Sequence, residues 1–236
     1  THAHRTTGGW LRESVDDASG GAVDVILSAD TPHLVYGTGA LRHAQRDASG
    51  WTIQTVDPAG VMAGRSLAVD SGGTPQVAYT GSNIGGRAEL RLARLTRTGW
   101  LVQVVDTLLP YQVGFEPSLR LDRQDYAHIS YRAYNGLKYA RWTGSEWYRV
   151  VVDPTESRDT SLALDATGTP HITYRRGLEL VYARRPGLNW TFRTLDTART
   201  TGTHTALALD ITGDAGDEVH ISYRDAESGS LRYARQ

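Results

Sequence analysis

The chain has 236 residues, no Cys, and 25 basic against 26 acidic residues, which gives a formal net charge of −1 at pH 7. The absence of Cys excludes disulfide scaffolds, thiolate metal sites and thiol nucleophiles. Nearly balanced charge is unlike the basic surface of a nucleic-acid-binding domain, and no apolar run approaches the roughly 20 residues that span a bilayer. We therefore expect neither a nucleic-acid partner nor insertion into a membrane.

A short motif recurs five times along the chain, with a tryptophan at its start and an aspartate six residues later. The five pairs are Trp10 and Asp16, Trp51 and Asp57, Trp100 and Asp106, Trp147 and Asp153, and Trp190 and Asp196. Repeats with a period of roughly 45 residues are typical of arrays of identical structural units. The chain is therefore expected to fold as a series of such units.

Three further motifs lie between successive tryptophans. The first reads Ser-Leu-Ala-Leu-Asp with variations and occupies residues 24–28, 66–70, 118–122, 161–165 and 206–210. The second ends in Tyr and occupies residues 32–36, 75–79, 127–131, 170–174 and 219–223. The third begins with Leu and ends in Ala and occupies residues 41–44, 90–93, 137–140, 180–183 and 231–234. Alternating apolar and polar residues between turn-forming Gly, Asp and Pro predict one strand for each motif.

Four short strands in each unit predict an all-β fold, a five-bladed β-propeller with four antiparallel strands per blade. The expected blades, within one domain of residues 1–236, are 23–56, 65–105, 117–152, 160–195 and 205–236. The last blade lacks a fourth strand of its own, so we expect the N-terminal strand 10–15 to close it and remove the open sheet edge.

The first residues of the chain do not fit this scheme. Residues 1–5 resemble a third strand, but Leu231–Gln236 already fills that position in the last blade. We expect residues 1–5 either to remain as a frayed remnant of a longer blade array or to pair differently, including between chains. The start at Thr1 rather than Met also suggests a processed product or a piece of such an array.

These repeats resemble bacterial and archaeal propeller repeats of the SLALD-x-x-G-x-PHISY…LKYA…W type over nearly the whole chain. The Asp165–Pro170 turn is similar to the Asp-box hairpins of sialidase-like propellers, although its spacing differs and the following aromatic residue is missing. The resemblance implies a propeller fold. It implies little about the ligand, because one fold can carry many functions.

The longest and most variable loops of the predicted propeller emerge on one face, and variable loops on a rigid scaffold commonly bind ligands. We predict that ligand binding uses Tyr111, Phe115, Arg132, Tyr134, Arg158, Arg175, Arg199, His204 and Arg224. An ordinary solvated loop surface is the alternative. Three of these arginines follow the repeated Tyr, where they would either pair with the Asp that begins each loop or bind an anion such as a uronate or sulfate.

Histidine recurs at one position of the second strand, at His33, His128, His171 and His220, and Gln76 replaces it in one repeat. A catalytic residue is needed only once, so we expect these side chains to hydrogen-bond a backbone group or an Asp between blades. A ring of metal-binding imidazoles is the alternative. The repeated Tyr and Trp are expected in the core between blades, with sugar stacking as the alternative. No metal, cofactor or catalytic residue is assigned.

The sequence lacks the motifs of serine hydrolases, zinc proteases and phosphate-binding loops. We therefore expect a non-catalytic binding or scaffold propeller that is extracellular, periplasmic or on the cell surface, with a glycan or another protein as partner. A polysaccharide lyase or glycoside hydrolase is the alternative. Glu116 and Asp159 precede first strands near the axis and would suit a hydrolase, and His128 would suit a lyase. A third hypothesis is a subunit of a larger blade array or an end-exchanged oligomer.

Overall fold

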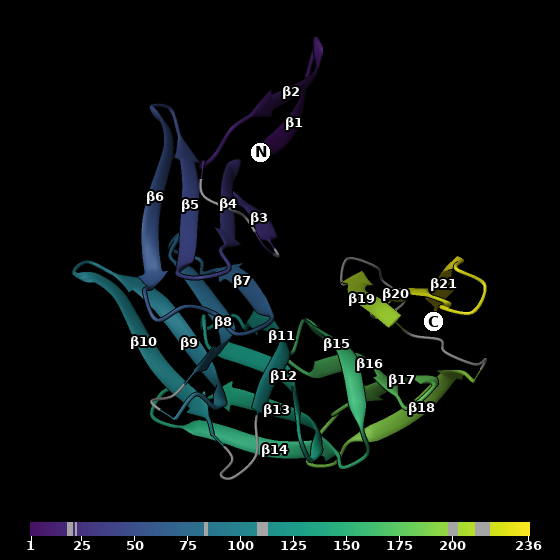
Figure 1. Cartoon of the computed structure of the whole chain (residues 1–236). Helices are drawn as coiled ribbons and strands as arrows, with labels where there is room; N and C mark the ends of the chain where they lie inside the picture. The colour runs from purple at the N-terminus through teal and green to yellow at the C-terminus, as the bar shows by residue number, and fades with distance from the viewer. Residues whose placement is uncertain (18–20, 22, 83–84, 108–112, 198–202, 211–217) are drawn as a thin grey trace.

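The computed structural model describes residues 1–17, 21, 23–82, 85–107, 113–197, 203–210 and 218–236. Every regular element within these ranges is a β-strand, and the strands form six antiparallel sheets (Figure 1). Among the same residues, no helix is long and apolar enough to cross a membrane. The expectation of an all-β, antiparallel fold is confirmed.

The sheets, here named A to F in chain order, each pair strands that are consecutive in sequence. Sheet A contains β1 (His2–Thr6) and β2 (Gly9–Glu13). Sheet B contains β3 (Asp24–Ser28), β4 (Thr31–Tyr36), β5 (Leu41–Asp47) and β6 (Gly50–Asp57). Sheet C contains β7 (Arg65–Val69), β8 (Pro75–Ser82), β9 (Ala88–Thr96) and β10 (Gly99–Asp106).

The remaining sheets follow the same order. Sheet D contains β11 (Val113–Leu121), β12 (Ala127–Ala133), β13 (Gly136–Trp142) and β14 (Trp147–Asp153). Sheet E contains β15 (Ser157–Leu164), β16 (Pro170–Arg176), β17 (Glu179–Arg184) and β18 (Thr191–Asp196). Sheet F contains β19 (Thr203–Asp210), β20 (Glu218–Arg224) and β21 (Leu231–Arg235).

The first strands of sheets B to F lie innermost, because β3 contacts β7, β7 contacts β11, β11 contacts β15, and β15 contacts β19. Figure 1 shows the sheets arranged along an open arc, with β6, β10, β14 and β18 on its outer side. The repeated tyrosines are buried between the sheets, as the sequence predicts. Sheets B to E thus bury apolar side chains against their neighbours in the chain. In sheet A, Trp10 is 72% exposed, so the expectation that the repeated tryptophans lie in the core is wrong for this residue.

The predicted closure of the last blade by residues 10–15 is wrong. β2 pairs with β1, from His2 opposite Glu13 to Thr6 opposite Gly9, and sheet F has three strands. Only two residues separate β1 from β2, so this hairpin closes a much shorter loop than pairing with β21 would require. The described residues consequently form six sheets rather than five blades, and within them the first and last sheets are not paired (Figure 1).

One hydrogen bond recurs between successive sheets. The Tyr near the end of a second strand donates its phenol O–H to the Asp that follows or ends the last strand of the preceding sheet, with O···O distances of 2.5–2.9 Å. The pairs are Tyr36 and Asp16, Tyr79 and Asp57, Tyr131 and Asp106, Tyr174 and Asp153, and Tyr223 and Asp196. A cation pairs with the same carboxylate each time, from Arg42, Arg91, Lys138, Arg176 and Arg232 respectively.

A β-bulge explains why the aspartate reaches the next sheet. In sheets B to E, the pairing of the third and fourth strands shifts by one residue just before the Asp. The extra residue re-aims the side chain that follows it. In sheet C, for example, Val105 and Asp106 are consecutive and both buried, which an unbroken alternating strand would not allow.

The innermost strands carry a second link between sheets. The first residue of the Ser-Leu-Ala-Leu-Asp motif accepts a hydrogen bond from the backbone N–H of the motif's Leu in the next sheet, at 2.8–3.1 Å. The acceptors are the Asp24 carboxylate and the Ser66, Ser118 and Ser161 hydroxyls, and the donors are Leu67, Leu119, Leu162 and Leu207. These bonds fix the spacing of the inner strands.

The repeated histidines have structural partners within their own sheets, not between blades as the sequence analysis expects. His128 Nδ1 lies 2.6 Å from the Tyr139 hydroxyl, and its Nε2 lies 3.2 Å from an Asp122 carboxylate oxygen. His171 makes the same two contacts with Tyr182 and Asp165. Burial lowers the pKa of His128 to about 4, so its ring is neutral in the folded protein at pH 7.

Asp106→Ala is expected to lower the free energy of unfolding by about 3–5 kcal/mol, because it leaves the buried ammonium group of Lys138 without its counter-charge. Tyr131→Phe removes a single hydrogen bond to the same carboxylate and is expected to cost about 1–3 kcal/mol. Urea denaturation followed by tryptophan fluorescence measures both changes. The exposed Arg123→Ala variant serves as the control, and equal stability of Asp106→Ala and this control would contradict the role of the carboxylate.

Stability is expected to fall on acidification, partly through His128. The pKa of this ring is lower in the folded protein, about 4, than its ordinary value of 6.5. Its contribution is therefore complete above pH 6.5 and is lost as the pH falls through 4. His128→Gln, which introduces the residue that Gln76 supplies in sheet C, should reduce the difference in unfolding free energy between about pH 7 and about pH 4.5. An unchanged difference in urea titrations would contradict this assignment.

Candidate functional site

The predicted loop-face residues fall into two groups. Tyr111 and Arg199 lie outside the described residues. The others lie at the corresponding ends of inner and second strands or in the adjoining loops, at Phe115, Arg132, Tyr134, Arg158, Arg175, His204 and Arg224. The structure therefore brings members of the predicted set to one end of sheets D, E and F.

Two arginines of this set, Arg132 and Arg175, contact carboxylates other than the predicted ones. The guanidinium of Arg132 lies 4.6 Å above the Phe115 ring and 3.4 Å from a Glu116 carboxylate oxygen. Arg175 lies 3.2 Å from an Asp159 carboxylate oxygen. The aspartates that begin the loops were expected to bind these arginines, but the bulges turn them toward the tyrosines of the next sheet.

Three residues at equivalent positions of β11, β15 and β19 share a left-handed backbone. These are Glu116, Asp159 and His204, with φ of 51°, 54° and 53°. The Asp159 N–H donates to the Glu116 carboxylate at 2.5 Å, and the His204 N–H donates to the Asp159 carboxylate at 3.2 Å. Non-glycine residues in this conformation carry strain that is often found at functional sites. Each of the two carboxylates is thus held by a backbone N–H of the next inner strand, Glu116 by β15 and Asp159 by β19.

A shallow pocket of about 240 Å³ adjoins this group and is lined by Glu156, Arg158, Arg175, Gly177 and Leu178. Arg158 pairs with Glu156, and Arg175 pairs with Asp159. An anion that bound here would have to displace these carboxylates. The loop end is therefore a salt-bridged surface rather than a preformed anion site.

The interface between sheets C and D differs from its neighbours. At three other interfaces, a ring on the third strand of a sheet, or on β1 of sheet A, packs edge-on against the repeated Trp that follows it in the chain, with ring centroids 5.1–5.5 Å apart. These pairs are His2 and Trp51, His43 and Trp100, and Tyr139 and Trp190. The residue that faces Trp147 at the equivalent position is Leu92, which has no ring. Gln76 also replaces the repeated His beside it.

A pocket of about 390 Å³ occupies this interface. Sheet C contributes Gln76, Leu92, Arg94, Leu101, Val102 and Gln103, and sheet D contributes Gln124, Asp125, Tyr126, Ala127, Trp142 and Trp147. At both Leu92 and Gln76 the repeat's ring is replaced by a side chain without a ring, which accounts for the unfilled space because side chains otherwise fill a protein interior closely. The pocket is therefore a local departure from the repeat.

Aromatic rings and unpaired amides meet in this pocket. The Trp142 and Trp147 rings pack at 5.5 Å and 60°, and the buried Trp147 indole N–H has no hydrogen-bond partner among the described residues. Within the same ranges, the side-chain amides of Gln76 and Gln103 form no hydrogen bond, although Gln76 is buried. Because buried polar groups are normally paired, these groups are available to a polar ligand.

The rim of the pocket is held in place before any ligand enters. Asp125, with φ of 61°, reaches sheet C and accepts hydrogen bonds from the Ser71 N–H at 2.9 Å and the Ser71 hydroxyl at 2.5 Å. Arg94 lies 3.6 Å from an Asp70 carboxylate oxygen. Tyr126 lies so close to Gly144 that a Cβ there would be 2.9 Å from the phenol oxygen. These contacts preorganise the pocket, which reduces the entropic cost of binding.

This pocket was not predicted from the sequence. Gln76 was recognised only as an interruption in the histidine series, and Leu92 was not singled out. Both residues depart from the repeat within the same unit, and these two departures were the feature of the sequence that could have indicated the pocket. Potential metal ligands were also missed: among the described residues, His2, His4 and Glu13 form a group close enough to bind one ion. That group lies in sheet A and not at the pocket.

No family model matches the chain, and no curated protein matches it. The resemblance of its repeats to bacterial and archaeal propeller repeats therefore stays a prediction.

Solved structures provide the remaining comparison. A variant of Aleuria aurantia lectin in complex with Fucalpha1-6GlcNAc is 15% identical, with a TM-score of 0.61 over 98% of this chain and 79% of the lectin. An alpha-L-arabinofuranosidase from Fusarium graminearum is 12% identical, with a TM-score of 0.60 over 94% and 81%. An alpha-L-arabinanase from Cellvibrio cellulosa is 11% identical, with a TM-score of 0.52 over 93% and 92%. At these identities the likeness shows the fold alone, which is that of a β-propeller.

Proposed function

We propose that the chain is a carbohydrate-binding propeller and that the pocket between sheets C and D is its binding site. The observation that carries the proposal is the combination of indole rings with unpaired side-chain amides in one preformed pocket. The apolar face of a sugar ring packs on an aromatic side chain, while amides donate to and accept from its hydroxyl groups. A volume of about 390 Å³ is within the range of small-ligand sites.

The charges around the pocket favour a neutral sugar. Arg94 lies near Asp70, and Asp125 accepts two hydrogen bonds from Ser71, so each charged group at the rim has a partner. A uronate or sulfate would require an unpaired cation in the pocket. The ligand we propose is therefore a neutral glycan residue, bound through its ring face and hydroxyl groups.

The comparisons support this class of ligand without assigning residues. The Aleuria aurantia lectin, which has the same fold, is described as fucose-specific and has a variant solved with Fucalpha1-6GlcNAc. The proposed partner of this chain is accordingly a glycan, and we propose an extracellular, periplasmic or cell-surface location, where glycans are displayed. An end-exchanged oligomer or a larger blade array would present the same pocket.

Leu92→Tyr is expected to weaken glycan binding at least about tenfold, because it restores the ring that fills the equivalent space at Tyr139. A glycan array identifies a bound sugar, and isothermal titration calorimetry with that sugar measures the change. Thermal unfolding checks that the variant remains folded. Gln76→His combined with Leu92→Tyr restores the full repeat pair and should bind no better than Leu92→Tyr alone.

Arg158→Ala provides the matched control at the loop face. If binding uses the pocket between sheets C and D, this variant keeps the affinity of the unaltered chain. Loss of binding in Arg158→Ala together with unchanged binding in Leu92→Tyr would overturn the pocket and favour the loop face.

Glycoside hydrolysis at the inner ends of β11 and β15 is a second candidate function. The Glu116 carboxylate accepts a hydrogen bond from the Asp159 backbone N–H, and both residues have a left-handed backbone conformation. Glycoside hydrolases generally use two carboxylates. Each carboxylate already pairs with an arginine, so a substrate would have to displace that partner. Release of reducing sugar that is lost in Glu116→Gln would establish this activity. Glycan binding without any product would exclude it for that glycan.

A further inference from the structure

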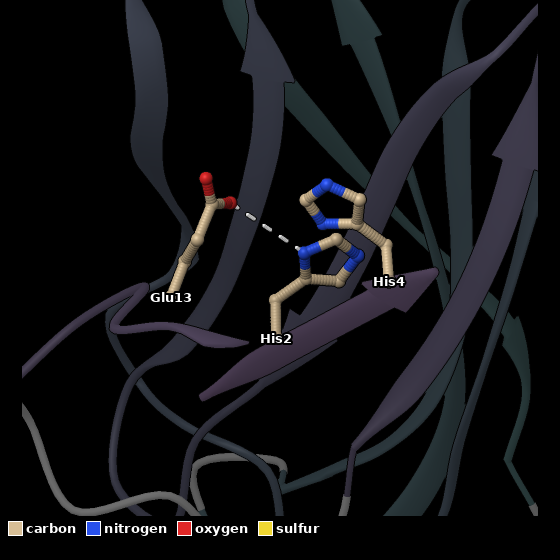
Figure 2. A group of neighbouring side chains, drawn as sticks. All are labelled: His2, His4 and Glu13. Carbon is tan, nitrogen blue, oxygen red and sulfur yellow. Dashed lines mark ion pairs between the residues drawn. The ribbon is translucent and has the colours of Figure 1, made fainter. Parts of the chain in front are cut away.

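Three side chains with metal-binding atoms share one face of the hairpin β1–β2 (Figure 2). His2 and His4 are two residues apart on β1, so their side chains point to the same side of the sheet. Glu13 lies directly opposite His2 on β2. One ligand atom from each residue lies within 4.8 Å of the other two. The register of a two-stranded sheet therefore brings two imidazoles and a carboxylate together.

Both imidazole rings have an unsatisfied nitrogen. The Nδ1 atoms of His2 and His4 are buried, and neither has a hydrogen-bond partner among the described residues. The two rings stack with centroids 5.3 Å apart. The Glu13 carboxylate is directed toward His2, but the distance of 3.6 Å from its oxygen to Nδ1 exceeds that of a hydrogen bond (Figure 2). Leaving such atoms buried and unpaired is unfavourable, and a bound cation would satisfy them.

The orientation of the carboxylate is fixed by a residue of sheet B. Arg46 on β5 donates one hydrogen bond to each Glu13 oxygen, both at 2.8 Å. Outer residues that hydrogen-bond a ligating carboxylate in this way fix its orientation in many metal sites. Arg46 thus holds a potential ligand in place from the neighbouring sheet.

The three potential metal ligands His2, His4 and Glu13 are not shared by the other repeats. The equivalent positions hold His43, Gln45 and Gln54 in sheet B; Leu92, Arg94 and Gln103 in sheet C; Tyr139, Arg141 and Val150 in sheet D; and Tyr182, Arg184 and Arg193 in sheet E. None of these four described sets supplies three metal ligands. The donor set of sheet A is therefore a specific departure from the shared pattern.

We propose that His2, His4 and Glu13 bind one divalent transition-metal ion. Two imidazoles and one carboxylate suit Zn²⁺, with water completing the coordination. The ion ties β1 to β2 on the side where His2 packs against Trp51 of sheet B, with ring centroids 5.1 Å apart. A two-stranded hairpin is only marginally stable on its own. The metal thus links the two strands of sheet A.

Isothermal titration calorimetry of the untagged chain with ZnCl₂ tests the proposal. We expect one Zn²⁺ per chain, and we expect His2→Ala, His4→Ala and Glu13→Gln each to weaken binding at least about tenfold. The exposed His204→Ala variant is the control and should bind Zn²⁺ like the unaltered chain. Substitution of Co²⁺ should give visible absorption bands that report nitrogen and oxygen coordination.

Thermal unfolding provides a second readout, because a ligand that binds only the folded state raises the unfolding midpoint. Zn²⁺ should raise the midpoint of the unaltered chain and of His204→Ala but not that of Glu13→Gln. Each variant's midpoint without metal shows whether it folds. Absence of Zn²⁺ binding overturns the proposal. Binding that Glu13→Gln leaves unchanged also overturns it, because it would then arise from the N-terminal segment alone.

Discussion

A carboxylate that two sheets share is the constraint on which the rest of the molecule depends. Each bulge places an Asp where it must be satisfied by the Tyr and a cation of the following sheet, as Asp106 is by Tyr131 and Lys138. A buried carboxylate cannot lose these partners without a large cost, so the rotation between neighbouring sheets is fixed. That rotation in turn determines which third-strand side chain meets the next Trp. The pocket at Leu92 exists because the frame around it keeps its geometry.

The strands and their grouping were predictable from the residues, because period-two alternation and regularly spaced turn residues act locally. How the strands at the two ends of the chain pair was not predictable. Residues 1–5 and 231–236 both carry the pattern of a third strand, and the pattern alone does not state which of them Gly9–Glu13 will pair with. Proximity in the chain decided this, through a hairpin with a two-residue turn. The number of sheets followed from that single choice.

The candidate site was harder to predict for a related reason. Gln76 and Leu92 visibly depart from the repeat, but the space they leave depends on Trp147, which comes from a different sheet. The partners of Arg132 and Arg175 were predicted wrongly because a bulge changes where the side chain after it points, and bulges leave little trace in an alternating pattern. The histidines were correctly expected to be structural, although their partners Asp122 and Tyr139 belong to the same sheet as His128. The types of residue in the repeat predicted which side chains are structural, whereas the contacts between different sheets could not be predicted from the sequence.

The contact between a third-strand ring and the following Trp determines how many ligand-binding pockets one chain can carry. At Leu92, a pocket arises by the loss of a ring rather than by the addition of a loop. The interfaces at His43 and Tyr139 share the same frame and keep their rings. Each of them is a latent pocket that would open if both the ring and the repeated His beside it were replaced by residues without rings. Two pockets on one rigid frame would engage a branched ligand with an avidity well above the affinity of either alone.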